Sequence, residues 1–131
     1  MVTGANTTAF IQRIKVQEMQ DYCISHFELS PELPSGLRWI KAPSRSHLRL
    51  TGTMAGTKTA KGYYRVSVRG RRFMTHQIVY ALAHGFKLVA DVRKDKSLSF
   101  DHIDRVKDNN HPFNIRIADW STQNRNRATQ A

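Results

Sequence analysis

The last third of the chain contains side chains of the types that can hydrolyse a phosphodiester bond. Asp101 and His102 are adjacent, and asparagines follow at positions 114 and 124. A neutral imidazole can accept a proton from water near pH 7, because its ordinary pKa is close to neutrality. A carboxylate is a hard oxygen ligand that suits Mg²⁺ or a similar ion such as Mn²⁺. These residue types in a very basic chain indicate metal-assisted phosphodiester hydrolysis.

The local pattern around these residues predicts a strand, a loop, a second strand and a final helix. Apolar residues flank the Asp-His pair, and residues 108–112 have the composition of a turn. Residues 114–118 alternate between polar and apolar side chains, as a half-buried strand does. Asp119 or Ser121 can cap the helix that follows.

The order of these short motifs resembles the HNH nuclease family, in particular small phage endonucleases of the homing type. The motif corresponds to residues 101–104, 109–110, 114–118 and 123–127, and the blocks that usually precede it correspond to residues 36–41, 55–56, 62–66 and 76–80. The resemblance implies that His102 is the general base and that Asn114 pins the two strand ends within the catalytic site. It further implies that Asp101 and Asn124 bind Mg²⁺ or another divalent cation. The Asp-His pair would lie at the mouth of the loop, where adjacent residues can share one site despite the alternation of a strand.

The spacing to the distal metal ligand departs from the common form of the family. The usual spacing from Asn114 reaches Gln123, and Asn124 stands one residue later. One step along a helix rotates a side chain by about 100°. Asn124 therefore requires an inserted residue near Trp120, whereas Gln123 keeps the register with a longer side chain and Asn126 should face away. We expect Asn124 to be the ligand.

Other polar residues near the motif have simpler interpretations. His76 matches a histidine of the family, and a packing or capping role is expected for it. Asp104 is expected to stabilise the turn, and Asn110 is interpreted as turn chemistry. His111 is expected to face solvent.

Positive charge is concentrated after residue 35. The formal net charge is +11, which favours a polyanionic partner, here double-stranded DNA. Residues 63–69 alternate, so that Tyr64, Val66 and Val68 can be buried while Tyr63, Arg65, Ser67 and Arg69 share the other face. The alternative is an ordinary solvated face. The arginines expected to contact DNA are Arg65, Arg69, Arg71, Arg72, Arg116, Arg125 and Arg127.

The rest of the chain predicts the scaffold. Two helices are expected, one over 7–22 capped by Asn6, Thr7 or Thr8, and one from a Thr75 cap to His84 that Gly85 ends. Strands are expected over 37–41 and 49–54. The expected connecting segments are a linker over 30–36, a turn over 56–62 and a solvated connector over 91–96. The fold class expected is α+β, with an N-terminal helix, a small antiparallel sheet plus helix, and a C-terminal ββα-metal motif. The three segments 1–35, 36–90 and 91–131 would form one compact domain.

The composition excludes several other classes of protein. No apolar run approaches the roughly 18 residues of a membrane span, and the start of the chain lacks a secretory pattern, so a cytoplasmic protein is expected. Cys23 is the only cysteine, which excludes an internal disulfide and a structural zinc on paired cysteines. A monomer or a homodimer is expected. The alternative function is a non-catalytic DNA- or RNA-binding protein whose motif is vestigial.

Overall fold

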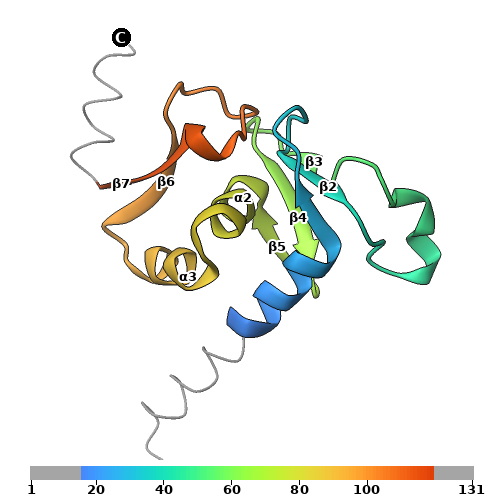
Figure 1. The fold of residues 1–131 in the computed structure, drawn as a ribbon. Helices are drawn as coiled ribbons and strands as arrows, with labels where there is room; N and C mark the ends of the chain where they lie inside the picture. The colour runs from blue at the N-terminus through green and yellow to red at the C-terminus, as the bar shows by residue number, and fades with distance from the viewer. Residues whose placement is uncertain (1–15, 120–131) are drawn as a thin grey trace, which may run out of the picture.

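Helix α2 (Thr75–His84) is the element against which both major hairpins pack. The computed structural model describes residues 16–119. Within them, α2 lies between two antiparallel hairpins, β4 (Tyr64–Val68) with β5 (Arg71–Met74), and β6 (Leu98–His102) with β7 (Ile115–Asp119) (Figure 1). Both hairpins can pack against α2 because apolar side chains cover more than one face of this helix.

The apolar core draws on segments that are far apart in the sequence. It includes Cys23 and Phe27 near the start of the described chain, Val68 from β4, Val79 from α2 and Ile115 from β7. These side chains are almost completely removed from water, and burial of apolar area is the main favourable term in folding. The core therefore fixes both hairpins relative to α2.

Three small antiparallel sheets surround this core in the described part of the chain. Strand β1 (Phe27–Leu29) pairs with β2 (Leu37–Trp39), β3 (Thr57–Lys58) pairs with the edge of β4, and β6 pairs with β7. Together with the helices, they confirm the α+β class expected from the sequence.

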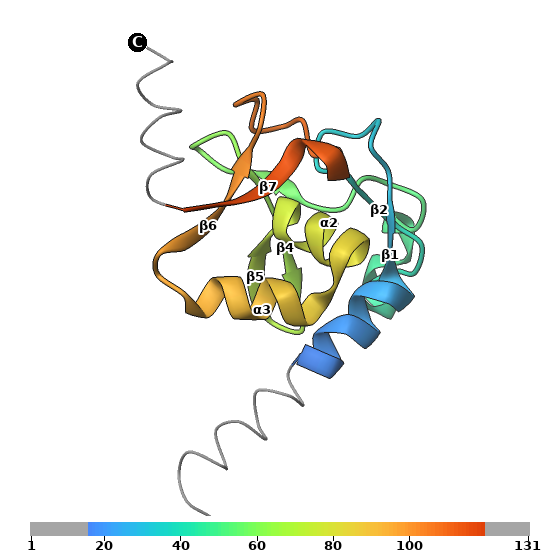
Figure 2. The ribbon, with the colours of Figure 1, turned by 60° about the vertical axis from the view of Figure 1, so that its left-hand side comes forward.

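Helix α3 (Phe86–Lys94) replaces most of the solvated connector predicted for residues 91–96, and that prediction was wrong (Figure 2). Phe86, Val89 and Val92 are buried at the three-residue spacing of one helix face. Gly85 does end α2, as predicted, with a φ of 125°, but the chain then begins a second helix. No helix within residues 16–119 is long and apolar enough to cross a membrane.

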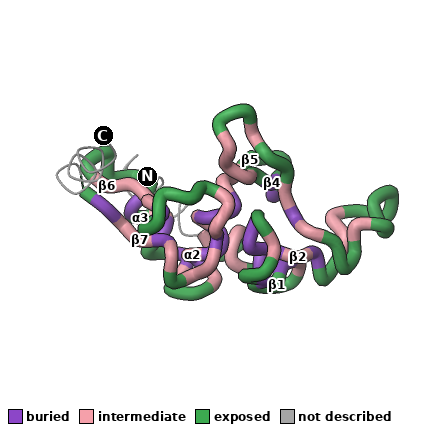
Figure 3. The backbone as a smooth tube through the Cα atoms, turned by 90° about the horizontal axis from the view of Figure 1, so that it is seen from above, coloured by how far each residue is buried: buried purple, intermediate pink, exposed green. Residues whose placement is uncertain are grey.

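Residues 49–54 do not form the predicted strand. The chain instead makes a 3₁₀ helix, η1 (Arg45–Leu50), in which no residue is buried (Figure 3). Leu50 nevertheless packs against the core as a partly buried residue. Residues 52–55 then run beside β2, with a bridge between Arg38 and Met54 and three backbone hydrogen bonds. The predicted turn over 56–62 also differs, because it contains β3.

The ends of three predicted helices need correction or lie outside the described residues. Within the described residues, the first helix continues to residue 26, past the predicted end at Tyr22. Thr75 is the first residue of α2 and not its cap, because β5 runs directly into the helix and leaves Met74 at the cap position. The caps predicted at Asn6, Thr7 or Thr8 and the final helix after Asp119 lie outside the described residues.

Candidate active site

Asp101 and His102 are the last two residues of strand β6. Asp101 pairs with Arg116 and His102 with Ile115 on β7. Neighbouring residues of a strand point to opposite faces, and accordingly His102 is only 4% exposed whereas the Asp101 side chain is 25% exposed. The strand ends at His102, so the pair lies at the mouth of the loop that leads to η2 (Pro112–Asn114).

The imidazole of His102 has one polar contact and several ring contacts. Its Nε2 lies 2.7 Å from Oδ1 of Asn110. Its ring meets the ring of His76 edge to face with centroids 4.9 Å apart, and the Tyr63 ring is 6.1 Å away. Asn110, interpreted from the sequence as turn chemistry alone, is 1% exposed and holds the ring from the loop side.

His76 on α2 is a packing histidine. Burial and, secondarily, the charge of His102 lower the pKa of His76 to about 3. Its ring also lies 5.8 Å from Tyr63 and 6.4 Å from Phe100. Because it stays neutral near pH 7, His76 supplies contact area beside His102 without adding a positive charge.

The side chain of Asn114 closes the loop between β6 and β7. Its Nδ2 donates to Oδ1 of Asp104 (2.9 Å) and to the Asn109 carbonyl (2.8 Å), and its Oδ1 accepts from the Asp104 backbone N–H (3.1 Å). Its own carbonyl accepts from the N–H of Ile103 (2.7 Å). These contacts join the first residues of the loop to its last residue.

Asp104 is the second residue whose side chain holds this loop through several hydrogen bonds. Its carboxylate also accepts from the Asn109 side chain (2.6 Å) and from the Val106 N–H (2.9 Å). Burial alone would raise the pKa of Asp104, but the hydrogen bonds from Asn109, Val106 and Asn114 outweigh it and hold the pKa below its ordinary value. His111 is partly exposed, and its Nδ1 also accepts from the N–H of Phe113 at the start of η2.

The Asp101 carboxylate forms an ion pair with Arg116 on strand β7. A terminal nitrogen of Arg116 lies 3.2 Å from Oδ2 of Asp101, and the Nε of Arg116 is buried with no hydrogen-bond partner within residues 16–119. The carboxylate suits a hard divalent cation, but an ion there must share Asp101 with Arg116 or displace the guanidinium.

The second protein ligand expected for such an ion lies outside the described residues. Residues 16–119 contain no group of three or more His, Cys, Asp or Glu side chains that could hold a metal. The ligand expected from the sequence, Asn124, and its alternatives Gln123 and Asn126 lie outside the described residues, as do Arg125 and Arg127.

The arginines of the β4–β5 hairpin lie on two faces, and those within the strands follow strand alternation. Arg65 and Arg72 share the exposed face of the β4–β5 hairpin, since Arg65 pairs with Met74 and Ser67 pairs with Arg72. These two guanidinium groups are placed to contact a polyanion laid across that face.

Arg69 and Arg71 border the opposite side of the same hairpin. Arg69 lies in the turn with a φ of 51°, and Arg71 pairs with the buried Val68. Both line a cavity of about 440 Å³ between α2, α3 and the N-terminal helix, together with Arg93. The prediction that Arg69 continues the face of Arg65 was wrong, because the turn begins at Arg69.

Comparison with known proteins supports the fold. No protein-family model matches the sequence, and no curated protein matches it. The structure is similar to a solved structure described as "DNA binding and cleavage by the HNH homing endonuclease I-HmuI", with a TM-score of 0.54 and 20% sequence identity. The match covers 86% of this chain, which spans 56% of the length of that protein. The chain therefore has an HNH-like fold.

Proposed function

We propose that this protein is a divalent-metal-dependent DNA endonuclease that hydrolyses phosphodiester bonds. The observation that carries the proposal is the β6–loop–β7 unit, which holds an imidazole and a carboxylate at one strand end within an HNH-like fold. The similarity concerns the fold, and the residue chemistry of the loop supports the catalytic role.

His102 acts as the general base in this proposal. Its ring is fixed by Asn110, His76 and Tyr63, so it can accept a proton from water without first losing rotational freedom. Asn114 keeps the loop closed through contacts to Asp104 and Asn109. A fixed base and a fixed loop are what an in-line attack on phosphorus requires.

Asp101 and Asn124 would hold Mg²⁺ or Mn²⁺. When bound, such an ion supplies positive charge for the scissile phosphate and the leaving oxygen. Asp101 would offer the hard oxygen, and Arg116, whose terminal nitrogen lies 3.2 Å from it, would have to share or release the carboxylate. Arg65 and Arg72 would contact phosphates along the duplex.

The decisive experiment is cleavage of supercoiled plasmid in Mg²⁺, in Mn²⁺ and in EDTA. Nicked circles should accumulate with either ion, and chelation should abolish them. The His102→Ala variant serves as the control for a contaminating nuclease. A metal-dependent product that the variant forms equally fast would contradict the proposal.

A comparison of three variants would assign the distal ligand. Asn124→Ala should abolish Mg²⁺-dependent nicking, whereas Gln123→Ala and Asn126→Ala should retain it. Loss of activity in Gln123→Ala with retention in Asn124→Ala would show that the ungapped register of the motif is the correct one.

The Asp101–Arg116 ion pair favours one alternative, a non-catalytic DNA-binding protein. The Arg116 guanidinium neutralises the Asp101 carboxylate, so a protein that only binds DNA would need no metal ion at this site. Calorimetry with Mg²⁺ in the presence of DNA separates the two functions. The endonuclease predicts a metal affinity that falls in Asp101→Ala and rises in Arg116→Ala, whereas the binding protein predicts no metal-dependent heat in any form.

A further inference from the structure

We propose that Asn110 is a positioning residue that determines which ring nitrogen of His102 carries the proton, and that the turn over residues 30–36 fixes Asn110. The consequence for cleavage rests on the proposed function, whereas the proton assignment itself does not. The proposal follows from the donors and acceptors that meet around one buried amide.

The orientation of the Asn110 amide is settled by its second neighbour. Its Nδ2 lies 2.7 Å from the carbonyl oxygen of Pro34. A carbonyl oxygen can only accept a hydrogen bond, so the amide nitrogen must face Pro34. The reverse orientation would bring two oxygens together in a site that is almost closed to water, since Asn110 is 1% exposed.

The orientation of the amide then fixes the tautomer of His102. With its nitrogen on Pro34, Asn110 presents Oδ1 to Nε2 of His102 at 2.7 Å. An amide oxygen has no proton to give, so Nε2 must be the donor. In a neutral imidazole the other nitrogen, Nδ1, then carries the lone pair.

Nδ1 is the nitrogen left for chemistry. Within residues 16–119, the structure gives Nδ1 of His102 no hydrogen-bond partner. The ring contacts of His76 and Tyr63 restrict rotation of the imidazole, so exchange of the two nitrogens by a ring flip is opposed. Nδ1 is therefore the atom that accepts the proton of the attacking water.

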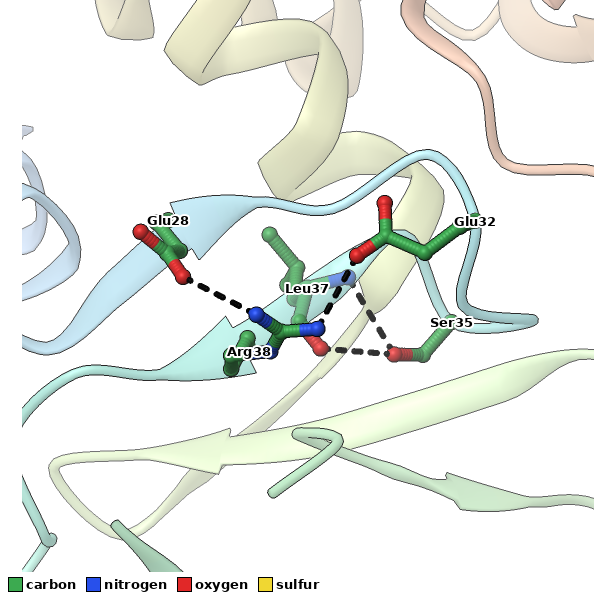
Figure 4. A network of polar contacts seen from close by, with 5 residues as sticks. All are labelled: Glu28, Glu32, Ser35, Leu37 and Arg38. Carbon is green, nitrogen blue, oxygen red and sulfur yellow. Dashed lines mark hydrogen bonds and ion pairs between the residues drawn. The ribbon is translucent and has the colours of Figure 1, made fainter. Parts of the chain in front are cut away.

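The turn that presents the Pro34 carbonyl is closed by backbone hydrogen bonds. The Ser30 N–H donates to the Gly36 carbonyl (2.8 Å), and the Gly36 N–H donates to the Leu33 carbonyl (2.9 Å). Figure 4 shows how side chains reinforce it, with Arg38 bridging Glu28 (3.6 Å) and Glu32 (2.9 Å).

The turn also packs closely against Asn110. Gly36 has a φ of 79°, and a Cβ there would lie 2.7 Å from the Asn110 carbonyl oxygen and 2.9 Å from the Asn110 Cβ. No larger residue fits without moving one of the two segments. The β1–β2 turn is far from the β6–β7 loop in the sequence, and its contact with Asn110 supports that loop.

Nitrogen NMR on protein labelled with ¹⁵N-histidine tests the assignment in the intact chain without metal or DNA. Long-range ¹H–¹⁵N correlations report which ring nitrogen is protonated, and His102→Ala identifies the His102 signals. We expect a protonated Nε2 and an unprotonated Nδ1 in the wild-type protein near pH 7.5. A wild-type spectrum with the proton on Nδ1, or with equal populations of the two tautomers, would overturn the proposal.

Variants of the two neighbouring asparagines then test the cause. In Asn110→Ala the signals should show mixed tautomers, whereas in Asn109→Ala, whose side chain binds Asp104 and not His102, Nε2 should stay protonated. A single Nε2–H tautomer in a folded Asn110→Ala protein would assign Asn110 a structural role only. If Asn110→Ala does not fold, the wild-type spectrum still decides the tautomer.

Kinetics connect the tautomer to cleavage. Asn110→Ala should lower kcat by roughly 10- to 100-fold with little change in KM, since a misplaced group loses rate while phosphate contacts keep affinity. A raised KM with an unchanged kcat would contradict a positioning role. Absence of cleavage by the wild-type protein, with the expected tautomer present, would reject the endonuclease function and leave the proton assignment standing.

Discussion

The two hairpins that flank α2 differ in how their strands are joined. Strands β4 and β5 are linked by Arg69 and Gly70, whose positive φ values (51° and 81°) are those of a tight hairpin turn. Strands β6 and β7 are linked by residues 103–114, whose path is held by side-chain hydrogen bonds. The first link is determined by backbone geometry, the second by polar side chains.

This difference determines what each hairpin can do. A tight turn leaves every side chain where strand alternation puts it, which yields a surface such as that of Arg65 and Arg72. A long loop can bring residues from separate turns to one strand end, which yields a site such as that of His102 and Asn110. We therefore expect β4–β5 to contribute affinity and β6–β7 to contribute chemistry.

Removal of the base should have the largest effect and act on rate alone. His102→Ala is expected to lower the cleavage rate by about 10²–10⁴, the usual contribution of a positioned base. DNA affinity should stay within a few fold, because it depends on phosphate contacts. Single-turnover cleavage and fluorescence anisotropy measure the two, with His47→Ala in the exposed η1 as control. Retention of more than about a tenth of the rate would exclude His102 as the base.

Loss of the carboxylate should remove the response to metal. Asp101→Ala is expected to abolish Mg²⁺-dependent cleavage, and raised Mg²⁺ should restore it poorly, because mainly neutral ligands remain for a hard cation. Cleavage rates across a Mg²⁺ titration measure this. Asp91→Ala, on the exposed side of α3, is the matched control. An unchanged Mg²⁺ midpoint in Asp101→Ala would rule out the ligand role.

Opening the long loop should lower stability in a pH-dependent way. Asn114→Ala removes three side-chain hydrogen bonds and should lower the free energy of unfolding by about 1–2 kcal/mol at pH 7. The pKa of Asp104 is depressed partly by Asn114. Its contribution is therefore present above the unfolded-state pKa of about 3.9 and is lost as the pH falls through the lower folded-state pKa.

Urea denaturation at neutral and acidic pH measures this effect. The difference between Asn114→Ala and the parent should shrink in acid, because a protonated Asp104 accepts a weaker hydrogen bond from the Asn114 amide. A difference of the same size at both pH values would show that the ionised form of Asp104 plays no part in closing the loop.

Changes to the surface of the short hairpin should alter DNA affinity but not chemistry. The double variant Arg65→Ala, Arg72→Ala should weaken binding to all sequences and lower the slope of log K against log salt by roughly 0.9 for each lost phosphate contact. The matched pair Arg69→Ala, Arg71→Ala, on the cavity side, should change the slope less. Equal slopes in the two double variants would remove the distinction between the faces.

The smallest effect is expected at the turn itself. Arg69 has a φ of 51°, a conformation that costs most residues about 1–2 kcal/mol and that asparagine tolerates better. Arg69→Asn should raise the melting temperature by a few degrees, and Gly70→Ala, at a φ of 81°, should lower it. Calorimetric melting of both variants measures this. A lower melting temperature in Arg69→Asn would mean that the side chain of Arg69 stabilises the fold.

Local patterns in the sequence predicted the elements that carry their own signals. The alternation around Val66 and the run after Asn114 gave the strands of both hairpins, and Gly85 marked the end of α2. Helix α3 was missed because its apolar stripe of Phe86, Val89 and Val92 is short and follows directly after a helix terminator. The strand predicted over 49–54 was wrong because residues 45–50 form η1 and only the end of the segment pairs with β2.

The sequence by itself determined the chemical groups and their order: the adjacent carboxylate and imidazole, the asparagine that closes the loop and the excess of arginine. Only the tertiary structure decided their partners. The Asn110 side chain forms hydrogen bonds with His102 and with the carbonyl of Pro34, which lies 76 positions before Asn110. Arg116 forms an ion pair with Asp101 across the hairpin. Local periodicity carries no information about such contacts, because packing of the core around α2 brings these segments together.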